Sequence, residues 1–132
     1  MGSRPRPLVL IVEDDDDTRE MYAWAMRAGG WSVEAVATGL DAIFVATRRH
    51  PDVIVMDLML PGLDGFEAVR RIKALPETWD IPVVALTGVN PSKVEALARS
   101  VGCAQFVAKP CLPDDLRTLL EDLVTGRAGS RP

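Results

Sequence analysis

Short apolar runs alternate along the chain with longer segments in which apolar residues recur every three or four positions. The short runs are typical of strands covered on both faces, and the longer segments are typical of helices that bury one side. We expect strands at residues 8–12, 31–36, 52–57, 81–87 and 104–108. Because the alternation occurs five times, the sequence predicts an α/β protein with a parallel sheet and helices on both of its faces.

Glycines and prolines mark where the expected helices begin and end. Gly29–Gly30, Pro51 and Gly102 follow the first, second and fourth helices, whereas Pro91 and Pro113 open the fourth and fifth. The apolar faces that we expect to turn inward comprise Met21, Trp24, Ala25 and Ala28, then Leu40, Ile43, Phe44 and Thr47, then Phe66, Val69 and Ile72, then Val94, Leu97, Ala98 and Val101, and finally Leu116, Leu119, Leu120 and Leu123.

Composition places the chain among small globular proteins. Its 132 residues suit one domain, and they are 48% hydrophobic and 26% charged with a net charge of -4. This acidic balance argues against direct nucleic-acid binding, because phosphate contacts need clustered lysines and arginines. No apolar run approaches the roughly 18 residues of a membrane span, and no signal peptide is apparent, so we expect a cytoplasmic protein with no membrane contact. Cys103 and Cys111 fit no zinc spacing and are expected to be reduced structural thiols.

The two ends of the chain carry the same tetrapeptide, GSRP, at residues 2–5 and 129–132. Such flanking repeats are typical of linker or cloning sequence, so both ends are left out of the fold prediction. We expect a flexible N-terminal tail at 1–7, one domain at 8–125 and a flexible C-terminal tail at 126–132.

Polar residues stand where the expected strands end. Glu13 and Asp14 follow the first strand, Asp57 ends the third, Thr87 ends the fourth and Lys109 follows the fifth. Binding sites of parallel sheets form beyond the carboxyl ends of the strands. We therefore expect all five groups to lie on one rim of the sheet.

The carboxylates on this rim predict a metal site. Three acids cannot all stay ionised close together without a cation, and oxygen ligands alone favour a hard ion. Magnesium fits best, with Mn²⁺ as an acceptable substitute. Taken alone, the acidic run Glu13 to Asp17 fits a charged helix start as well as a metal site. Asp15 or Asp17 is expected to cap the first helix, with the remaining acids in its solvated first turn.

Asp57 favours a functional site over a simple charged helix start. A carboxylate that ends an otherwise apolar strand and precedes the turn PGLDG is positioned as a nucleophile, whereas Asp64 in that turn is expected to bind backbone amides. Lys109, before Pro110, is the natural counter-charge, and Thr87 supplies a hydroxyl donor. Plainer roles exist for each of them: a turn residue, a surface lysine and a β-branched strand residue.

Taken together, the segments VED, MDLMLPGLDG, ALTG and FVAKP closely resemble the receiver domain of two-component response regulators. The likeness covers residues 8 to about 124, and the four motifs occur in the right order after the right strands. The resemblance implies a flavodoxin-like (βα)5 fold, a doubly wound parallel sheet of five strands in the order 2-1-3-4-5. It also implies that the peptide bond between Lys109 and Pro110 is cis.

The same resemblance assigns roles to the rim. It implies that Asp57 is the phosphoacceptor and that Glu13, Asp14, Asp57 and the backbone carbonyl of Met59 hold magnesium. It further implies that Thr87 and Lys109 contact the phosphoryl group, and that Thr87 acts as a switch together with the aromatic residue Phe106.

The function implied is a phosphorelay step in signal transduction rather than metabolic catalysis. A sensor histidine kinase or phosphotransfer protein would supply the phosphoryl group to Asp57. Thr87 would then move inward and Phe106 would rotate. The face built from the fourth helix, fifth strand and fifth helix would repack and bind a downstream protein, with a homodimer left open. Phe106 also fits a plain core aromatic.

Two departures from the family pattern carry expectations of their own. Glu13 stands where aspartate is commoner, and its longer side chain is expected to reach the ion through water. Met59 and Val89, two positions beyond Asp57 and Thr87, cannot orient an attacking water. The sequence therefore predicts a long-lived phosphoaspartate.

Other functions fit less well. A haloacid dehalogenase-type hydrolase needs a second aspartate where Met59 stands, a flavin phosphate would be repelled by five acids, and a GxxxxGK[ST] nucleotide loop is missing. A degenerate receiver used only for interaction typically loses the acceptor or the lysine, and both are here. The kinase, the target and the choice between a single-domain regulator and a piece of a longer chain stay open.

Overall fold

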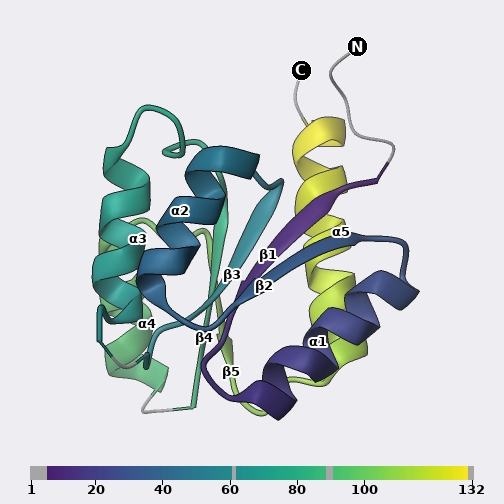
Figure 1. Ribbon diagram of the computed structural model, residues 1–132, viewed down its shortest axis with the longest axis horizontal. Helices are drawn as coiled ribbons and strands as arrows, with labels where there is room; N and C mark the ends of the chain where they lie inside the picture. The colour runs from purple at the N-terminus through teal and green to yellow at the C-terminus, as the bar shows by residue number, and fades with distance from the viewer. Residues whose placement is uncertain (1–5, 61, 89–90, 131–132) are drawn as a thin grey trace.

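Five parallel strands form one sheet in the order β2-β1-β3-β4-β5, with helices on both sides (Figure 1). The computed structural model describes residues 6–60, 62–88 and 91–130, and for 91 and 126–130 it describes the backbone alone. The strands are β1 (Leu8–Val12), β2 (Ser32–Val36), β3 (Val53–Asp57), β4 (Val83–Thr87) and β5 (Gln105–Ala108). The helices are α1 (Asp16–Ala28), α2 (Gly39–Arg49), α3 (Gly65–Ala74), α4 (Pro91–Ser100) and α5 (Pro113–Ser130). The predicted fold class and strand order are confirmed.

Alternate side chains of the central strands enter two separate hydrophobic cores. In β1, Val9 and Ile11 pack with residues of α1 and α5, whereas Leu10 and Val12 pack with residues of α2, α3 and α4. Figure 1 shows the same division, with α1 and α5 on one side of the sheet and the other three helices opposite. Because helices cover both faces of the sheet, the central strands are apolar except at the residues that end β3 and β4. The short apolar runs from which the strands were predicted have this origin.

Polar side chains begin the first three helices. Asp15 caps α1 by accepting a hydrogen bond from the amide of Thr18, and Thr38 caps α2 in the same way. Asp64 caps α3 by accepting from the amide of Glu67. Each cap satisfies a backbone donor that has no partner within its own helix. The expectation that Asp15 or Asp17 caps the first helix is thus resolved in favour of Asp15, and the turn role of Asp64 is confirmed.

The expected inward faces of three helices are partly wrong. Trp24 and Met21 are 73% and 45% exposed, and Ala28 is exposed as well; Ala25 is buried as expected, together with Tyr22, Ala23 and Met26. In α2, Leu40, Phe44 and Thr47 are exposed, and the helix buries Gly39, Ala42 and Ala46; in α4, Leu97 is exposed as well. Small side chains let a helix approach the sheet closely, so α2 buries its glycine and alanines, whereas α1 buries two alanines together with Tyr22 and Met26.

Element boundaries differ from the prediction mainly at the amino ends. Strands β2, β3, β4 and β5 begin one or two residues later than expected, whereas the carboxyl ends of all five agree. The backbone of α5 is helical to Ser130, beyond the expected domain end at 125, although Gly126 and Gly129 each cost a helix about 1 kcal/mol. The first five residues and the last two, which belong to the predicted tails, lie outside the described residues. Within the described part of the chain, none of the helices combines the length and apolar character that crossing a membrane requires.

Candidate functional site

The predicted rim residues meet at the carboxyl edge of the sheet. Asp57 is the last residue of β3, Thr87 is the last of β4, and Lys109 directly follows β5. The strand register pairs Asp57 with Leu86 and Thr87 with Ala108, so these three strand ends lie level with one another. Glu13, Asp57 and Thr87 are 2%, 4% and 0% exposed, which places two carboxylates and a hydroxyl in the protein interior.

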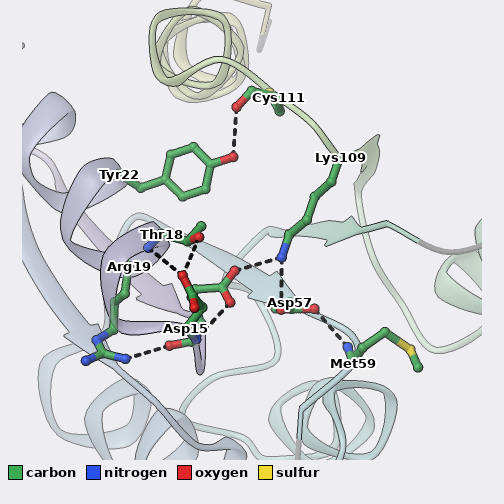
Figure 2. Close-up of polar contacts among 9 residues, drawn as sticks. Asp15, Thr18, Arg19, Tyr22, Asp57, Met59, Lys109 and Cys111 are labelled. Atoms are coloured by element: carbon green, nitrogen blue, oxygen red, sulfur yellow. Dashed lines mark hydrogen bonds and ion pairs between the residues drawn. The ribbon is translucent and has the colours of Figure 1, made fainter.

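Lys109 links the two buried carboxylates. Its Nζ lies 2.9 Å from Oε1 of Glu13 and 3.2 Å from Oδ2 of Asp57, and Figure 2 shows the side chain reaching down toward Asp57. The amide of Lys109 donates to the carbonyl of Thr87 at 2.8 Å, which anchors the start of its loop to β4. One ammonium therefore serves two carboxylates, and the buried pair keeps a net negative charge.

Burial and ion pairing oppose each other in this cluster. Burial raises the pKa of Glu13, and the hydrogen bond from Lys109 offsets part of that rise. Burial alone would lower the pKa of Lys109, but the hydrogen bonds and charges of Glu13 and Asp57 outweigh it and raise the pKa above its usual value. Lys109 is therefore cationic at neutral pH and available as a fixed positive charge.

The second oxygen of each buried carboxylate accepts a backbone hydrogen bond. Oδ1 of Asp57 accepts from the amide of Met59 at 2.9 Å, and Oε2 of Glu13 accepts from the amide of Asp15 at 3.1 Å. These contacts fix the direction in which both carboxylates point. The resemblance assigned the carbonyl of Met59 to the ion; the structure adds a contact by its amide, and the role of the carbonyl stays a prediction.

Gly65 shows why the turn after Asp57 needs a glycine. A Cβ at this position would lie 2.5 Å from the carbonyl oxygen of Asp57 and 2.5 Å from Cα of Leu58. Only a residue without a side chain lets α3 start against the end of β3. The last glycine of the PGLDG motif is thus explained by close packing beneath the site.

Three carboxylates form a group that suits a hard cation. Glu13, Asp14 and Asp57 each offer one oxygen, and these oxygens lie within 4.8 Å of one another. Asp14 is exposed, so the group opens to solvent on that side. The donors are all oxygens, without thiolate or imidazole, which is the ligand set that favours Mg²⁺, Mn²⁺ or Ca²⁺ over zinc. The residues present therefore fit the predicted magnesium ion.

Comparison with known proteins agrees with this geometry. The profile of the response regulator receiver domain matches residues 9–121. The chain belongs to this family. It is 36% identical over 104 residues to the transcriptional regulatory protein AfsQ1 of Streptomyces coelicolor, a match covering 79% of this chain and 45% of AfsQ1. It is 33% identical over 102 residues to the polar-differentiation response regulator DivK of Brucella ovis, covering 77% of this chain and 83% of DivK.

Solved receiver domains share the fold. The receiver domain of the sensor histidine kinase PA1611 from Pseudomonas aeruginosa, solved with a magnesium ion coordinated in its active site cleft, superposes with a TM-score of 0.84. That match has 30% sequence identity and covers 91% of this chain and 98% of the other. This receiver domain spans about half the length of the curated transcriptional regulators that it matches.

Two supporting residues of the receiver site were missed at the sequence level. The hydroxyl of the buried Tyr22 donates to the carbonyl of Cys111 at 2.8 Å, tying α1 to the loop that carries Lys109 (Figure 2). Nη1 of Arg19 donates to the carbonyl of Glu13 at 3.0 Å and so holds the backbone of the acidic pair. No sequence motif marks either contact. Tyr22 and Cys111 are 89 positions apart in the sequence. The available signal was that both Tyr22 and Arg19 lie on a helix next to the strand ends.

The remaining predicted groups lie close to the site. Phe106 is half-buried in β5 and packs against the core on the α2, α3 and α4 side. The peptide bond between Lys109 and Pro110 is cis, as the resemblance implied. Cys103 and Cys111 are both free, which agrees with reduced thiols. Val89 lies outside the described residues.

Proposed function

We propose that this receiver domain accepts a phosphoryl group on Asp57 from a phosphohistidine of a sensor histidine kinase or phosphotransfer protein. The observation that carries the proposal is the position of Asp57, a buried carboxylate 3.2 Å from a lysine ammonium and close to two further acids. A structural ion pair would need one carboxylate for one lysine. The excess of negative charge instead fits a site that receives cations and a phosphoryl group.

Asp57 suits the nucleophile better than its acidic neighbours do. Glu13 makes the shorter contact with Lys109, at 2.9 Å, and holds the amide of Asp15 with its other oxygen. Asp14 is exposed and solvated. Asp57 lies between strand ends, beside Thr87 and Lys109, where groups from β4 and β5 can surround an attached phosphoryl group.

The chemical step is an in-line displacement. A bond forms between an oxygen of Asp57 and phosphorus while the bond from phosphorus to the donor nitrogen breaks, and the electron pair leaves with the imidazole. Lys109 offsets charge on the phosphoryl oxygens, and the Thr87 hydroxyl donates a hydrogen bond to one of them. The protein contributes position and electrostatics, and its backbone contacts keep Asp57 oriented before the donor arrives.

Magnesium is part of the proposal. Glu13, Asp14, Asp57 and the carbonyl of Met59 would hold the ion, Glu13 through water, and Mn²⁺ would substitute. A bound magnesium ion would supply positive charge next to the phosphoryl oxygens. The oxygen-only donor set supports this assignment, and the related PA1611 receiver domain contains magnesium in its cleft.

Signal output is proposed to follow from Thr87 and Phe106. Thr87 would move toward the phosphoryl group, Phe106 would rotate into the space released, and the face formed by α4, β5 and α5 would repack for a downstream protein. The exposed Leu97 and Leu112 offer apolar contact area there. We place the protein in the cytoplasm, where its phosphodonors occur, and we expect no direct contact with nucleic acid or membrane.

Phosphorylation with a small donor tests the proposal. The purified protein is incubated with acetyl phosphate and Mg²⁺, and its intact mass is recorded. We expect one phosphoryl adduct, none in Asp57→Asn and a strongly reduced yield in Lys109→Ala. The variant Asp64→Asn is the matched control, because this exposed helix cap should leave labelling unchanged. Equal labelling of wild type and Asp57→Asn, with both folded by circular dichroism, would refute the assignment.

The lifetime of the phosphoaspartate tests whether Met59 slows its hydrolysis. The Met59 side chain is 54% exposed and apolar, so it cannot orient an attacking water. We expect slow hydrolysis in the wild type and faster hydrolysis in Met59→Asn, measured as loss of the phosphoryl mass after the donor is removed. Hydrolysis that is slower in Met59→Asn than in the wild type would count against a role for this position.

A further inference from the structure

Exposed large apolar side chains gather on two opposite layers of the molecule. One group lies between α2 and α3 and lines a depression of about 650 Å³. We call this depression the α2–α3 groove; it is lined by Leu40, Ile43, Phe44, Thr47, Arg48, Arg71, Ala74 and Leu75. Leu40 and Phe44 are 61% and 60% exposed, more than large apolar residues normally are in the absence of a partner.

The α2–α3 groove is positively charged. The guanidinium of Arg48 lies 5.1 Å from the centre of the Phe44 ring, and Arg71 adds a second positive charge. Glu67 is the acid beside Arg71, but it also pairs with Arg70, so two arginines share one carboxylate. No acidic side chain lines the groove among the described residues. In a chain whose net charge is -4, this is a basic apolar surface.

The second group lies on the outer side of α1. Asp17, Glu20, Met21 and Trp24 are all exposed, and their spacing of three or four residues places them in one row along the helix. We call this row the α1 stripe. Trp24, at 73%, is the most exposed large apolar residue among those described. The stripe therefore combines two apolar side chains with two carboxylates near the start of the helix, and Arg19 and Arg27 lie beside Glu20 and Trp24 along one edge of it.

The two surfaces are complementary in charge and in shape. We propose that the α1 stripe of one copy of this protein docks in the α2–α3 groove of a second copy. Trp24 would pack beside Phe44 and Arg48, and Asp17 and Glu20 would face the arginines. An apolar helix face laid in a groove is a common mode of protein recognition, and buried aromatic and arginine side chains are the usual anchors of such interfaces.

Charge opposes a symmetric contact between two grooves, because it would bring Arg48 and Arg71 against the same arginines of the partner. The stripe and the groove lie on opposite sides of the sheet (Figure 1), so a copy that gives its stripe keeps its groove free. Such a head-to-tail contact does not close on itself and builds open chains as concentration rises. The interface uses neither Asp57 nor Lys109 and goes beyond the proposed function.

The test is the mass of the purified full chain in solution. For a dissociation constant on the order of 100 µM at each contact, open-chain growth should raise the weight-average mass to about six times that of the monomer near 1 mM, and high salt should lower it again. Trp24→Lys places a cation on the stripe, and Phe44→Glu places an anion in the groove. Each variant alone should stay monomeric in sedimentation velocity. Trp79→Lys is the matched control, because Trp79 is 61% exposed but belongs to neither surface.

Mixing the two variants gives the decisive result. Trp24→Lys keeps an intact groove and Phe44→Glu keeps an intact stripe, so a one-to-one mixture should form dimers and nothing larger. If Phe44→Glu is unfolded by circular dichroism, Leu40→Gln takes its place. A wild type that stays monomeric up to about 1 mM, variants that associate as the wild type does, or a mixture that stays monomeric would each overturn the proposal.

Discussion

The two ends of the sheet both gather charged residues, but they balance charge differently. At the carboxyl end, two carboxylates buried to 2% and 4% exposure share Lys109, and Asp14 adds a third acid nearby. At the amino end, His50 and Asp80 pair with each other at 3.0 Å, and both are about half exposed. Burial and an excess of one sign thus occur together at the carboxyl end only.

The other polar groups of the amino end hold the backbone. Asp52 accepts from the amide of Leu8 at 2.8 Å, and Nζ of Lys73 donates to the carbonyls of Trp79 and Ile81 at 3.1 and 2.5 Å. A cavity of about 740 Å³ lies among these residues, larger than the α2–α3 groove. The comparison teaches that unbalanced buried charge points to the candidate site, whereas the larger cavity lies among residues that hold the backbone.

Among the changes considered, removal of Lys109 should lower the stability of the fold most. Lys109→Met leaves two buried carboxylates without a cation, so we expect the free energy of unfolding to fall by about 2 to 3 kcal/mol in urea titrations with EDTA. Adding Glu13→Gln to that variant should restore part of the loss. At the amino end, Asp80→Asn should change stability by less than about 0.5 kcal/mol, because its contact with His50 is about half exposed. Equal losses of stability in Lys109→Met and Asp80→Asn would show that the two ends of the sheet do not differ in how they balance charge.

Divalent cations should act at one end only. Mg²⁺ at about thirty times its dissociation constant should stabilise the wild type by about 2 kcal/mol, because the ion binds the folded state alone. Thermal unfolding with and without EDTA measures this. Asp14→Asn and Asp57→Asn should lose the response, whereas Asp80→Asn should keep it. A response that survives in all three variants would place the ion elsewhere.

Near the amino end of the sheet, the buried thiol of Cys103 should make stability depend on pH at high pH. Burial raises the pKa of Cys103 from 9.0 to about 11. Between these values the unfolded chain has lost the thiol proton and the folded chain keeps it, so stability falls as pH rises. We expect the wild type to lose about 1 to 2 kcal/mol more than Cys103→Ala between about pH 8 and pH 10.5. Parallel curves for the two proteins in urea denaturation would show that the thiol is not protected.

The smallest effect concerns the loop that carries Lys109. Tyr22→Phe removes one buried hydrogen bond to the carbonyl of Cys111 while keeping the ring, so we expect a loss of about 1 kcal/mol. Burial raises the pKa of Tyr22, so the hydroxyl stays protonated and donates at neutral pH. Hydrogen exchange of the Lys109 amide should also become faster, since its loop is then held less firmly. Unchanged exchange would confine Tyr22 to a packing role.

The sequence alone located the site because its residues follow the ends of strands. Apolar runs gave the strands, and a parallel sheet brings their carboxyl ends to one edge whatever the details of packing. The positions of Glu13, Asp57, Thr87 and Lys109 on that edge could therefore be predicted without coordinates. Equally local rules narrowed the cap of α1 to Asp15 or Asp17 and assigned Asp64 to backbone amides.

Only the tertiary structure decided which sides of the helices are buried and how distant groups pair. A helical pattern gives a period, but it does not say which side is buried: α2 turned its alanines toward the sheet, and α1 turned Tyr22, Ala23, Ala25 and Met26 inward. The exposed Trp24 and Phe44 follow from that choice. The sharing of Lys109 between two carboxylates and the bond from Tyr22 to Cys111 join residues far apart in sequence, and such contacts depend on packing that no local pattern encodes.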